Sequence, residues 1–245
     1  MSSLPVFLVD RLPSVGATVL DGPEGRHAAT VRRLRAGEGL LLSDGRGGLA
    51  RCVVRAVGRD TVELGVERAW HEPPPSPRVV LAQALVKGDR GELAVELTTE
   101  AGVDEIVPWR AERCVARWDD GPRGDKALAR WRTTAREAAK QARRAWCPEV
   151  RPPVDTVALA ALASTVGCAL VLHESAERGL ASVPLPDSGD VLLVVGPEGG
   201  ITEAELGALA AAGAVVVRLG PTVLRASSAA AVALGALGAL TRRWQ

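Results

Sequence analysis

The pattern of hydrophobic and polar residues changes near residue 72. Before it, short runs rich in valine and leucine alternate with turns such as Asp44-Gly-Arg-Gly-Gly48, a pattern typical of short β-strands. One helical stretch, from about Glu24 to Arg35, interrupts them. The pattern predicts a small β-barrel over residues 1–72, with strands at Val6–Val9, Gly39–Ser43, Leu49–Val57 and Thr61–Val66.

A stiff proline segment follows, and residues 73–77 are the expected linker. Beyond it, apolar runs alternate with helical periodicity, which is typical of an α/β domain with a parallel sheet. We expect this domain to occupy residues 78–245. Its expected strands are Val79–Leu85, Val103–Pro108, Cys168–His173, Val191–Val195 and Val215–Val217, and its expected helices are Asp89–Ala101, Asp125–Trp146, Val157–Ser164 and two that begin near Thr202 and Ser227.

A glycine-rich loop, Gly196-Pro-Glu-Gly-Gly200, lies between a buried strand and a helix. Thr202 and Glu205 have the spacing of a capping box, which predicts the start of that helix. Ligands of open α/β sheets bind at such strand ends. Pro197 removes an amide donor and Glu198 would repel phosphate, so the loop suits a neutral or cationic ligand better than a phosphate.

A second loop of this kind, Leu219-Gly-Pro-Thr-Val-Leu-Arg225, follows the strand Val215–Val217 and precedes the helix near Ser227. Either loop alone is as consistent with an ordinary turn as with a binding site. The pair, in this order, favours one pocket walled by both.

Composition and cysteine spacing limit the other possibilities. The chain has 245 residues, 47% of them hydrophobic, and a net charge of +1. Its four cysteines lie far apart without a Cys-x-x-Cys pair, so we expect neither a metal site nor a disulfide framework. The longest apolar stretch, Ala229–Leu240, is shorter than the roughly 20 residues that span a bilayer. With no signal peptide evident at the N-terminus, we expect a cytoplasmic protein without a membrane partner.

Basic residues cluster in one expected helix. Eight of them lie between Arg123 and Arg144, against Asp125 and Glu137. A solvated helix face is one interpretation of such a run. The net excess of positive charge on one helix favours the other, a polyanionic partner.

The two loops together resemble the SPOUT methyltransferases, which carry a trefoil knot, and more narrowly the bacterial 16S ribosomal RNA uracil-N3 methyltransferases. The resemblance covers nearly the whole chain and includes His27, Val31, Arg33 and Gly37 in the first domain. It implies a PUA-like RNA-binding barrel followed by a SPOUT domain with a C-terminal knot and a mainly parallel sheet.

The chain departs from the family pattern at several positions. Arg32 and Ala101 stand where leucine is usual, and Lys140 and Ser227 stand where glutamate is usual. If the second glutamate serves catalysis, this chain works without it. If that glutamate only caps the helix, serine can replace it, because serine is a good cap.

The resemblance implies S-adenosylmethionine as the methyl donor. Arg225 and Glu198 are the catalytic candidates. Arg225 would stabilise the developing charge or bind a substrate phosphate, and Glu198 would lie near the sulfonium or, alternatively, anchor the loop. The cofactor-binding candidates are Leu172, Glu174, Gly196, Pro197, Glu198, Gly199, Ile201, Leu219, Gly220, Leu224 and Arg225.

The implied partners are 16S rRNA of the small ribosomal subunit and a second copy of the chain, joined through the knotted domain and the last helix. The RNA-binding candidates are Arg26, His27, Arg32, Arg33, Arg35, Lys87, Arg136, Arg143 and Arg144. For His27, packing on the barrel is an equal alternative. A SPOUT ribose 2′-O-methyltransferase and a non-catalytic RNA-binding or ribosome-assembly protein remain the alternative functions.

Overall fold

A computed structural model describes residues 4–244, which form two compact units. The first contains the chain up to Pro74 together with Ala139–Cys147, and the second contains Pro75–Ala138 and the chain from Pro148 onward. The sequence pattern placed residues 139–147 in the second domain. They belong to the first because backbone bonds hold them there: Gly47 N–H donates to Ala145 O at 2.9 Å, and Cys147 N–H donates to Gly45 O at 2.9 Å.

The first unit is a five-stranded sheet around one apolar core that includes Phe7, Leu40 and Leu64. The strand order is β1-β3-β4-β5-β2, and only the β1–β3 pair is parallel. Strand β2 was not expected from the sequence, because it lies at an edge and most of its residues are exposed. The strands are β1 (Val6–Leu8), β2 (Gly16–Leu20), β3 (Gly39–Ser43), β4 (Gly48–Val57) and β5 (Val62–His71).

The helical stretch in this unit is shorter than expected and changes type. An α-helix, α1 (Gly22–Arg26), continues into one π-helical segment, His27–Val31, in which Arg32 N–H donates to His27 O. Ala28 and Leu34 both enter the apolar core. A π-helical turn is wider than an α-helical one. The arginines that follow the segment, Arg32, Arg33 and Arg35, stay exposed to solvent.

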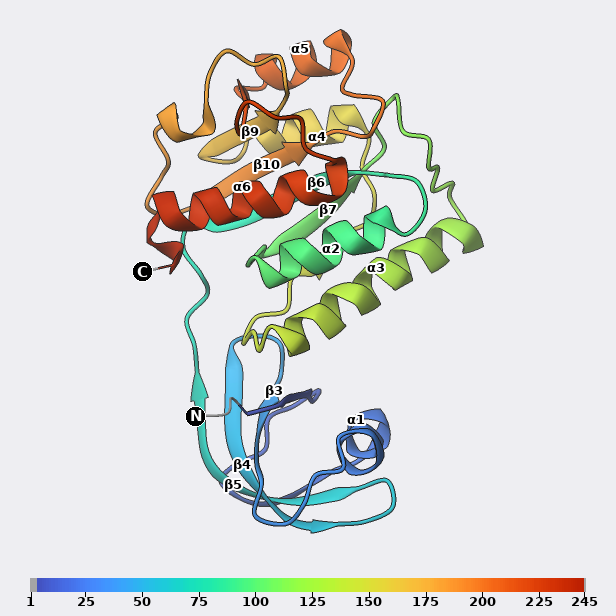
Figure 1. The fold of residues 1–245 in the computed structure, drawn as a ribbon, viewed down its shortest axis with the longest axis vertical. Helices are drawn as coiled ribbons and strands as arrows, with labels where there is room; N and C mark the ends of the chain where they lie inside the picture. Colours follow the sequence, from blue (N-terminus) through green and yellow to red (C-terminus); the bar gives the residue numbers. More distant parts are fainter. Residues whose placement is uncertain (1–3, 245) are drawn as a thin grey trace. The chain divides into compact units, whose positions relative to one another are not determined.

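The second unit has the expected parallel sheet (Figure 1). Its six strands are all paired in parallel, in the order β11-β9-β10-β6-β7-β8. Only the two-residue strand β8 has no counterpart among the expected strands. The strands are β6 (Arg78–Ala84), β7 (Glu105–Trp109), β8 (Glu149–Val150), β9 (Cys168–Leu172), β10 (Asp190–Val195) and β11 (Val215–Val217).

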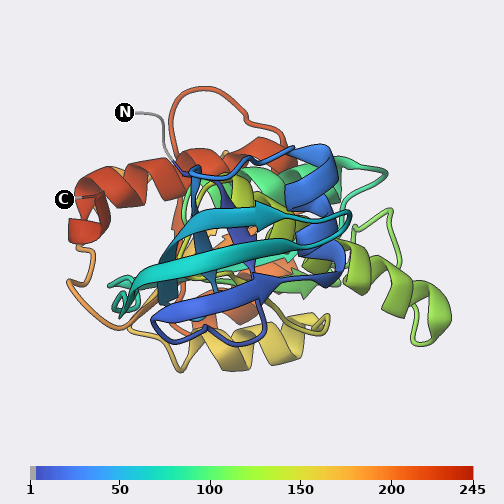
Figure 2. The same ribbon diagram turned by 90° about the horizontal axis from the view of Figure 1, so that it is seen from below.

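Helices cover both faces of this sheet. Helix α2 packs against α6, and α4 packs against α5; Figure 2 shows α4 (yellow) and α6 (red) on opposite sides of the unit. This double cover explains why β10 is apolar at every position after Asp190. No helix within residues 4–244 is long and apolar enough to cross a membrane. The helices are α2 (Arg90–Glu100), α3 (Pro122–Gln141), α4 (Thr156–Ala163), α5 (Glu203–Ala211) and α6 (Ala226–Leu240).

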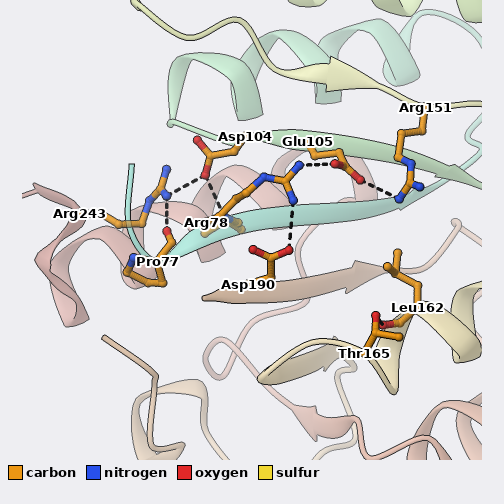
Figure 3. Close-up of polar contacts among 10 residues, drawn as sticks. Pro77, Arg78, Asp104, Glu105, Arg151, Leu162, Thr165, Asp190 and Arg243 are labelled. Atoms are coloured by element: carbon orange, nitrogen blue, oxygen red, sulfur yellow. Dashed lines mark hydrogen bonds and ion pairs between the residues drawn. The ribbon is translucent and has the colours of Figure 1, made fainter. Parts of the chain in front are cut away.

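Ion pairs join the amino ends of three adjacent strands (Figure 3). The Arg78 guanidinium donates to the carboxylates of Glu105 and, at 3.1 Å, of Asp190. Arg151 donates to the other oxygen of Glu105 at 3.0 Å. These bonds connect β6 with β7 and β10, its neighbours on either side.

Arg243 ties the C-terminal segment to the same edge of the sheet. It lies in the short 3-10 helix Arg242–Trp244 and donates to Asp104 at 2.7 Å and to the carbonyl oxygens of Pro77 and Gly102. The side chains of Arg243 and Asp104 are both more than nine-tenths buried. Asp104 also accepts a bond from Val79 N–H at 2.8 Å, so this pair is a buried link between strand starts and the chain end.

We predict that Arg243→Ala lowers the free energy of unfolding by about 3 kcal/mol, because it leaves the buried Asp104 carboxylate without its cation. Urea titration followed by circular dichroism measures the loss. Arg242→Ala is the matched control, since Arg242 is exposed and its removal should change stability by no more than about 0.5 kcal/mol. Equal losses in the two variants would contradict the structural role of the Arg243–Asp104 pair.

Candidate active site

A cavity of about 620 Å³ opens at the carboxyl ends of β9, β10 and β11. The strand register explains its position, because Leu172 of β9 lies beside both Val195 of β10 and Val217 of β11. The three strands therefore end at one edge, and the loops that follow them converge. Every residue that the sequence assigned to the cofactor lines this cavity: Leu172, Glu174, Gly196, Pro197, Glu198, Gly199, Ile201, Leu219, Gly220, Leu224 and Arg225.

The folded chain itself disfavours a side chain at each glycine of the first loop. A Cβ on Gly196 would lie 2.5 Å from the Ile201 side chain, and one on Gly199 would lie 3.0 Å from both Cβ and O of Arg113. Gly200 has φ +76°, which disfavours other residues. At Gly196 and Gly199, close approach of a ligand is therefore not needed to explain the glycine.

Gly220, in the second loop, is different. A Cβ there would have no heavy atom within 4 Å, and its φ lies outside the left-handed region. Nothing in the folded chain requires glycine at this position, although Gly220 lines the cavity. A side chain at this position would extend into open space at the cavity, where a ligand could lie.

Glu198 connects the first loop to the start of α2. Its Oε1 accepts a bond from Lys87 N–H at 3.4 Å and pairs with Arg90 Nη1 at 3.7 Å. Its side chain remains partly exposed and lines the cavity. The carboxylate thus anchors the loop and also places negative charge at the site.

Arg225 is the N-cap residue of α6, and its side chain lies at the cavity. Its carbonyl oxygen accepts bonds from Ser228 Oγ at 3.2 Å and from Ala229 N–H at 2.9 Å. Ser227 is buried inside the first turn, and no side chain caps this helix. The interpretation of Ser227 as a helix cap is therefore wrong.

Comparison with known proteins identifies the family. A family model described as an RNA methyltransferase domain matches residues 73–238, and one described as an RNA methyltransferase PUA domain matches residues 20–67. The chain belongs to the RNA methyltransferase family. Among curated relatives, the ribosomal RNA small subunit methyltransferase E of Mycobacterium tuberculosis is 54% identical over 98% of this chain and 93% of that protein.

More distant relatives agree with this assignment. The protein of the same name from Bacillus subtilis is 31% identical over 94% of this chain and 91% of that protein. The crystal structure of a ribosomal RNA small subunit methyltransferase E from Neisseria gonorrhoeae, bound to S-adenosyl methionine, superposes with a TM-score of 0.86 at 29% identity and covers 98% of each chain. These proteins are SPOUT methyltransferases, so the family expected from the two loops is confirmed.

Eleven of the residues that line the cavity were not among the predicted site residues, and four of these are arginine or histidine: Arg90, Arg113, His173 and Arg218. Arg90 and Arg113 lie in two further segments whose sequences are similar to family motifs, Lys87-Gly-Asp-Arg90 and Glu112-Arg-Cys114, and Arg218 directly precedes the second loop. Their position in or beside these motifs is the signal that could have identified them. In His173, Nδ1 accepts a bond from Ser175 N–H at 3.3 Å. The same ring nitrogen also lies 2.8 Å from Ser175 Oγ.

Cys114 lies near the site but is unsuited to chemistry. Burial raises the pKa of its thiol from the ordinary value for cysteine, and the negative charges of Glu205 and Glu198 raise it further. The group is therefore protonated at neutral pH and is a poor nucleophile. Within residues 4–244, no group of three or more His, Cys, Asp or Glu side chains could hold a metal ion.

The RNA-binding candidates of the first unit are mostly on its surface. Arg32, Arg33 and Arg35 are exposed, and Arg26 pairs with Asp60 at 3.4 Å while remaining exposed. His27 packs edge-on against Phe7, with 5.9 Å between ring centroids. This contact supports the packing role of His27 that the sequence left as an alternative.

The basic run is less available to a partner than its sequence indicates. Lys140 is buried and pairs with Glu24 at 2.8 Å. Arg132 donates to Val150 O at 3.0 Å, and Arg130 pairs with Glu92 at 3.4 Å. Arg136 and Arg143 are exposed, whereas Arg144 is half-buried and Lys87 is exposed outside the cavity lining. Helix α3 ends at Gln141, so Arg143 and Arg144 lie beyond it.

Proposed function

We propose that this protein transfers the methyl group of S-adenosylmethionine to N3 of a uridine in 16S rRNA of the small ribosomal subunit. The cavity walled by both family loops carries this proposal, because it brings all the expected cofactor residues to one place. The family membership and the 54% identity to a ribosomal RNA small subunit methyltransferase E support it.

The cavity residues fit such a cofactor in size and charge. A volume of about 620 Å³ is in the usual range for a small-molecule site. Leu172, Ile201, Leu219 and Leu224 provide apolar surface for a base, and Glu174 and Glu198 provide negative charge for a sulfonium. Arginines at the same cavity provide donors for a carboxylate. When bound, the cofactor supplies an electrophilic methyl group.

The chain's own residues position the uracil and stabilise charge. Uracil N3 carries an imide proton, and as this proton leaves, negative charge develops on the adjacent carbonyl oxygens. Arg225 is our candidate for donating a hydrogen bond to such an oxygen. The alternative role for Arg225 is to bind a phosphate of the substrate. Because N3 lies on the Watson–Crick edge, the target base must be unpaired or flipped out of its helix.

Mapping of modified nucleotides in a deletion strain tests this function. We expect one N3-methyluridine to disappear from 16S rRNA and to return when the gene is restored. Loss of a ribose 2′-O-methyl group would show instead that the chain modifies ribose. No lost methyl group, together with retained RNA binding by the purified protein, would favour the non-catalytic alternative.

We predict that Gly220→Val lowers S-adenosylmethionine affinity at least about tenfold, or roughly 1.4 kcal/mol, because the new side chain fills space inside the cavity. Stability should hardly change, since nothing lies within 4 Å of the new Cβ. Gly199→Val should also destabilise the protein through its contact with Arg113. Titration calorimetry on the folded variants measures affinity.

Gly179→Val is the matched control for the Gly220 variant. A Cβ on Gly179 also has no neighbour within 4 Å, its φ is −77°, and it does not line the cavity. It should bind the cofactor as the wild type does. Wild-type affinity in the Gly220 variant would place the cofactor elsewhere.

We propose that Arg136 and Arg143 contact RNA phosphates, because both are exposed members of the basic run. Arg136→Ala and Arg143→Ala should each weaken RNA binding and lower the slope of log affinity against log salt by roughly one unit. Arg136→Lys keeps the charge and should keep the slope. An unchanged slope in the alanine variants would mean that these side chains are only solvated.

We propose a homodimer in which α6 is part of the interface. Ala229, Ala233 and Leu237 are buried inside the chain's own core. Val232 is instead 49% exposed on α6, and Leu240 is equally exposed at the C-terminal end of the helix. Exposed apolar side chains on a helix that carries no charged residue favour a partner.

Light scattering should therefore give twice the chain mass at micromolar concentration. The Val232→Glu variant should be a monomer, because a dimer would bury the new charge at the interface. Val157→Glu is the control: Val157 is 79% exposed on α4, so this variant should stay dimeric. A monomeric wild type contradicts the dimer, and a dimeric Val232 variant excludes this part of α6.

A further inference from the structure

Glu205 is a buried carboxylate, only 4% exposed, in the first turn of α5. One of its oxygens serves the capping box expected from the sequence. Oε2 accepts bonds from Thr202 N–H at 3.0 Å and from Thr202 Oγ1 at 3.1 Å, while Glu205 N–H donates to Thr202 Oγ1 at 3.3 Å. The capping box is confirmed, and it accounts for Oε2 alone.

The other oxygen of Glu205 bonds to two segments far away in sequence. Oε1 accepts bonds from Glu112 N–H at 2.8 Å and from Thr156 Oγ1 at 3.0 Å. Thr156 Oγ1 in turn accepts the indole N–H of the buried Trp109 at 3.2 Å. Bonds to an ionised acceptor are stronger than neutral ones, and a buried chain of bonds gains further strength from mutual polarisation.

These bonds lead directly to the cavity. Glu112 is followed by Arg113, whose Nη1 donates to Gly199 O at 3.3 Å. The backbone of Arg113 fills the space where a Gly199 side chain would lie. Both Arg113 and Gly199 line the cavity, so the position of Glu112 determines how closely Arg113 holds the first glycine loop.

We propose that Glu205 is a positioning residue for cofactor binding: its Oε1 fixes Glu112, and Glu112 fixes Arg113 against Gly199. The proposal rests on the proposed function, because it assumes that the cavity binds S-adenosylmethionine. It explains why a full carboxylate is needed at this position. Glutamine would serve the capping box equally well, because it also has one acceptor oxygen. The two donors that bond to Oε1, Glu112 N–H and Thr156 Oγ1, need a second acceptor oxygen, which a carboxylate has and an amide lacks.

Glu205→Gln separates the two roles. The glutamine oxygen can keep the capping box, but its amide NH₂ group then faces Glu112 N–H, so two donors oppose each other. We expect the cofactor Kd and the KM for S-adenosylmethionine to rise roughly tenfold, as for a lost bond to a charged group, with kcat little changed. Thr202→Ala is the matched control, since it removes the capping side chain and leaves both Oε1 bonds. It should lower stability while leaving Kd unchanged.

A double-mutant cycle tests whether Glu205 acts through Arg113. Arg113→Ala should raise Kd by itself, and adding Glu205→Gln to it should raise Kd little further. Unfolding free energies measured on the same four proteins separate this coupling from general destabilisation. If the glutamine variant does not fold, Thr156→Val, which removes one donor to Oε1, takes its place in the cycle.

The outcomes distinguish this inference from the function on which it rests. Wild-type Kd in Glu205→Gln, additive effects in the cycle, or a Kd that Arg113→Ala does not change would each overturn the positioning role while the methyltransferase function stands. A wild-type protein that binds no S-adenosylmethionine in calorimetry would instead contradict the proposed function itself.

Discussion

Parallel pairing of β10 with β9 on one side and β6 on the other determines where the loops of the second unit lie. In a parallel sheet every carboxyl end points to the same edge. Leu172, Val195 and Val217 lie side by side at that edge, so the chain leaves the sheet there three times. This register places the three loops around a common space, and the cavity is the part of that space that the side chains of the loops leave open.

The two edges of the sheet carry different chemistry. At the amino ends, Arg78, Glu105 and Arg243 belong to ion pairs that join strand starts to each other and to the chain end (Figure 3). At the carboxyl ends, the charged groups are held mainly against loops: Glu198 bonds to the start of α2 and Arg113 bonds to Gly199 O. At the first edge the Arg243–Asp104 pair is buried and ties the strand starts together, whereas at the second edge Glu198 and Arg90 are partly exposed at the cavity.

The elements that the sequence predicted are those with local signals. The strand Val191–Val195 is an uninterrupted apolar run, and the helix after it begins at the capping box formed by Thr202 and Glu205. Both signals concern neighbouring residues. The strand was predicted within one residue of its observed bounds, and the start of the helix within one residue of its observed start. The family motifs added the two glycine loops, which the strand register then brings together.

The elements that were missed depend on distant partners. Strand β2 exists because it pairs with β5, although most of its own residues are exposed. Residues 139–147 join the first unit through bonds to the turn at Gly45 and Gly47. Likewise, the bonds of Glu205 Oε1 join residues 93 and 49 positions apart in sequence, which no local pattern can indicate.

The structure explains one of the two positions where a usual glutamate is replaced, Lys140, but not the other, Ser227. Lys140 replaces a usual glutamate, yet it is buried and paired with Glu24 at 2.8 Å. A buried cation is stable only with its partner, so the reversed charge is accommodated inside the first unit. This substitution therefore gives no support to a non-catalytic function. Ser227 is also buried, but it caps no helix, so a role in capping does not explain its presence. Of the two positions where a usual glutamate is replaced, only Ser227 still bears on catalysis.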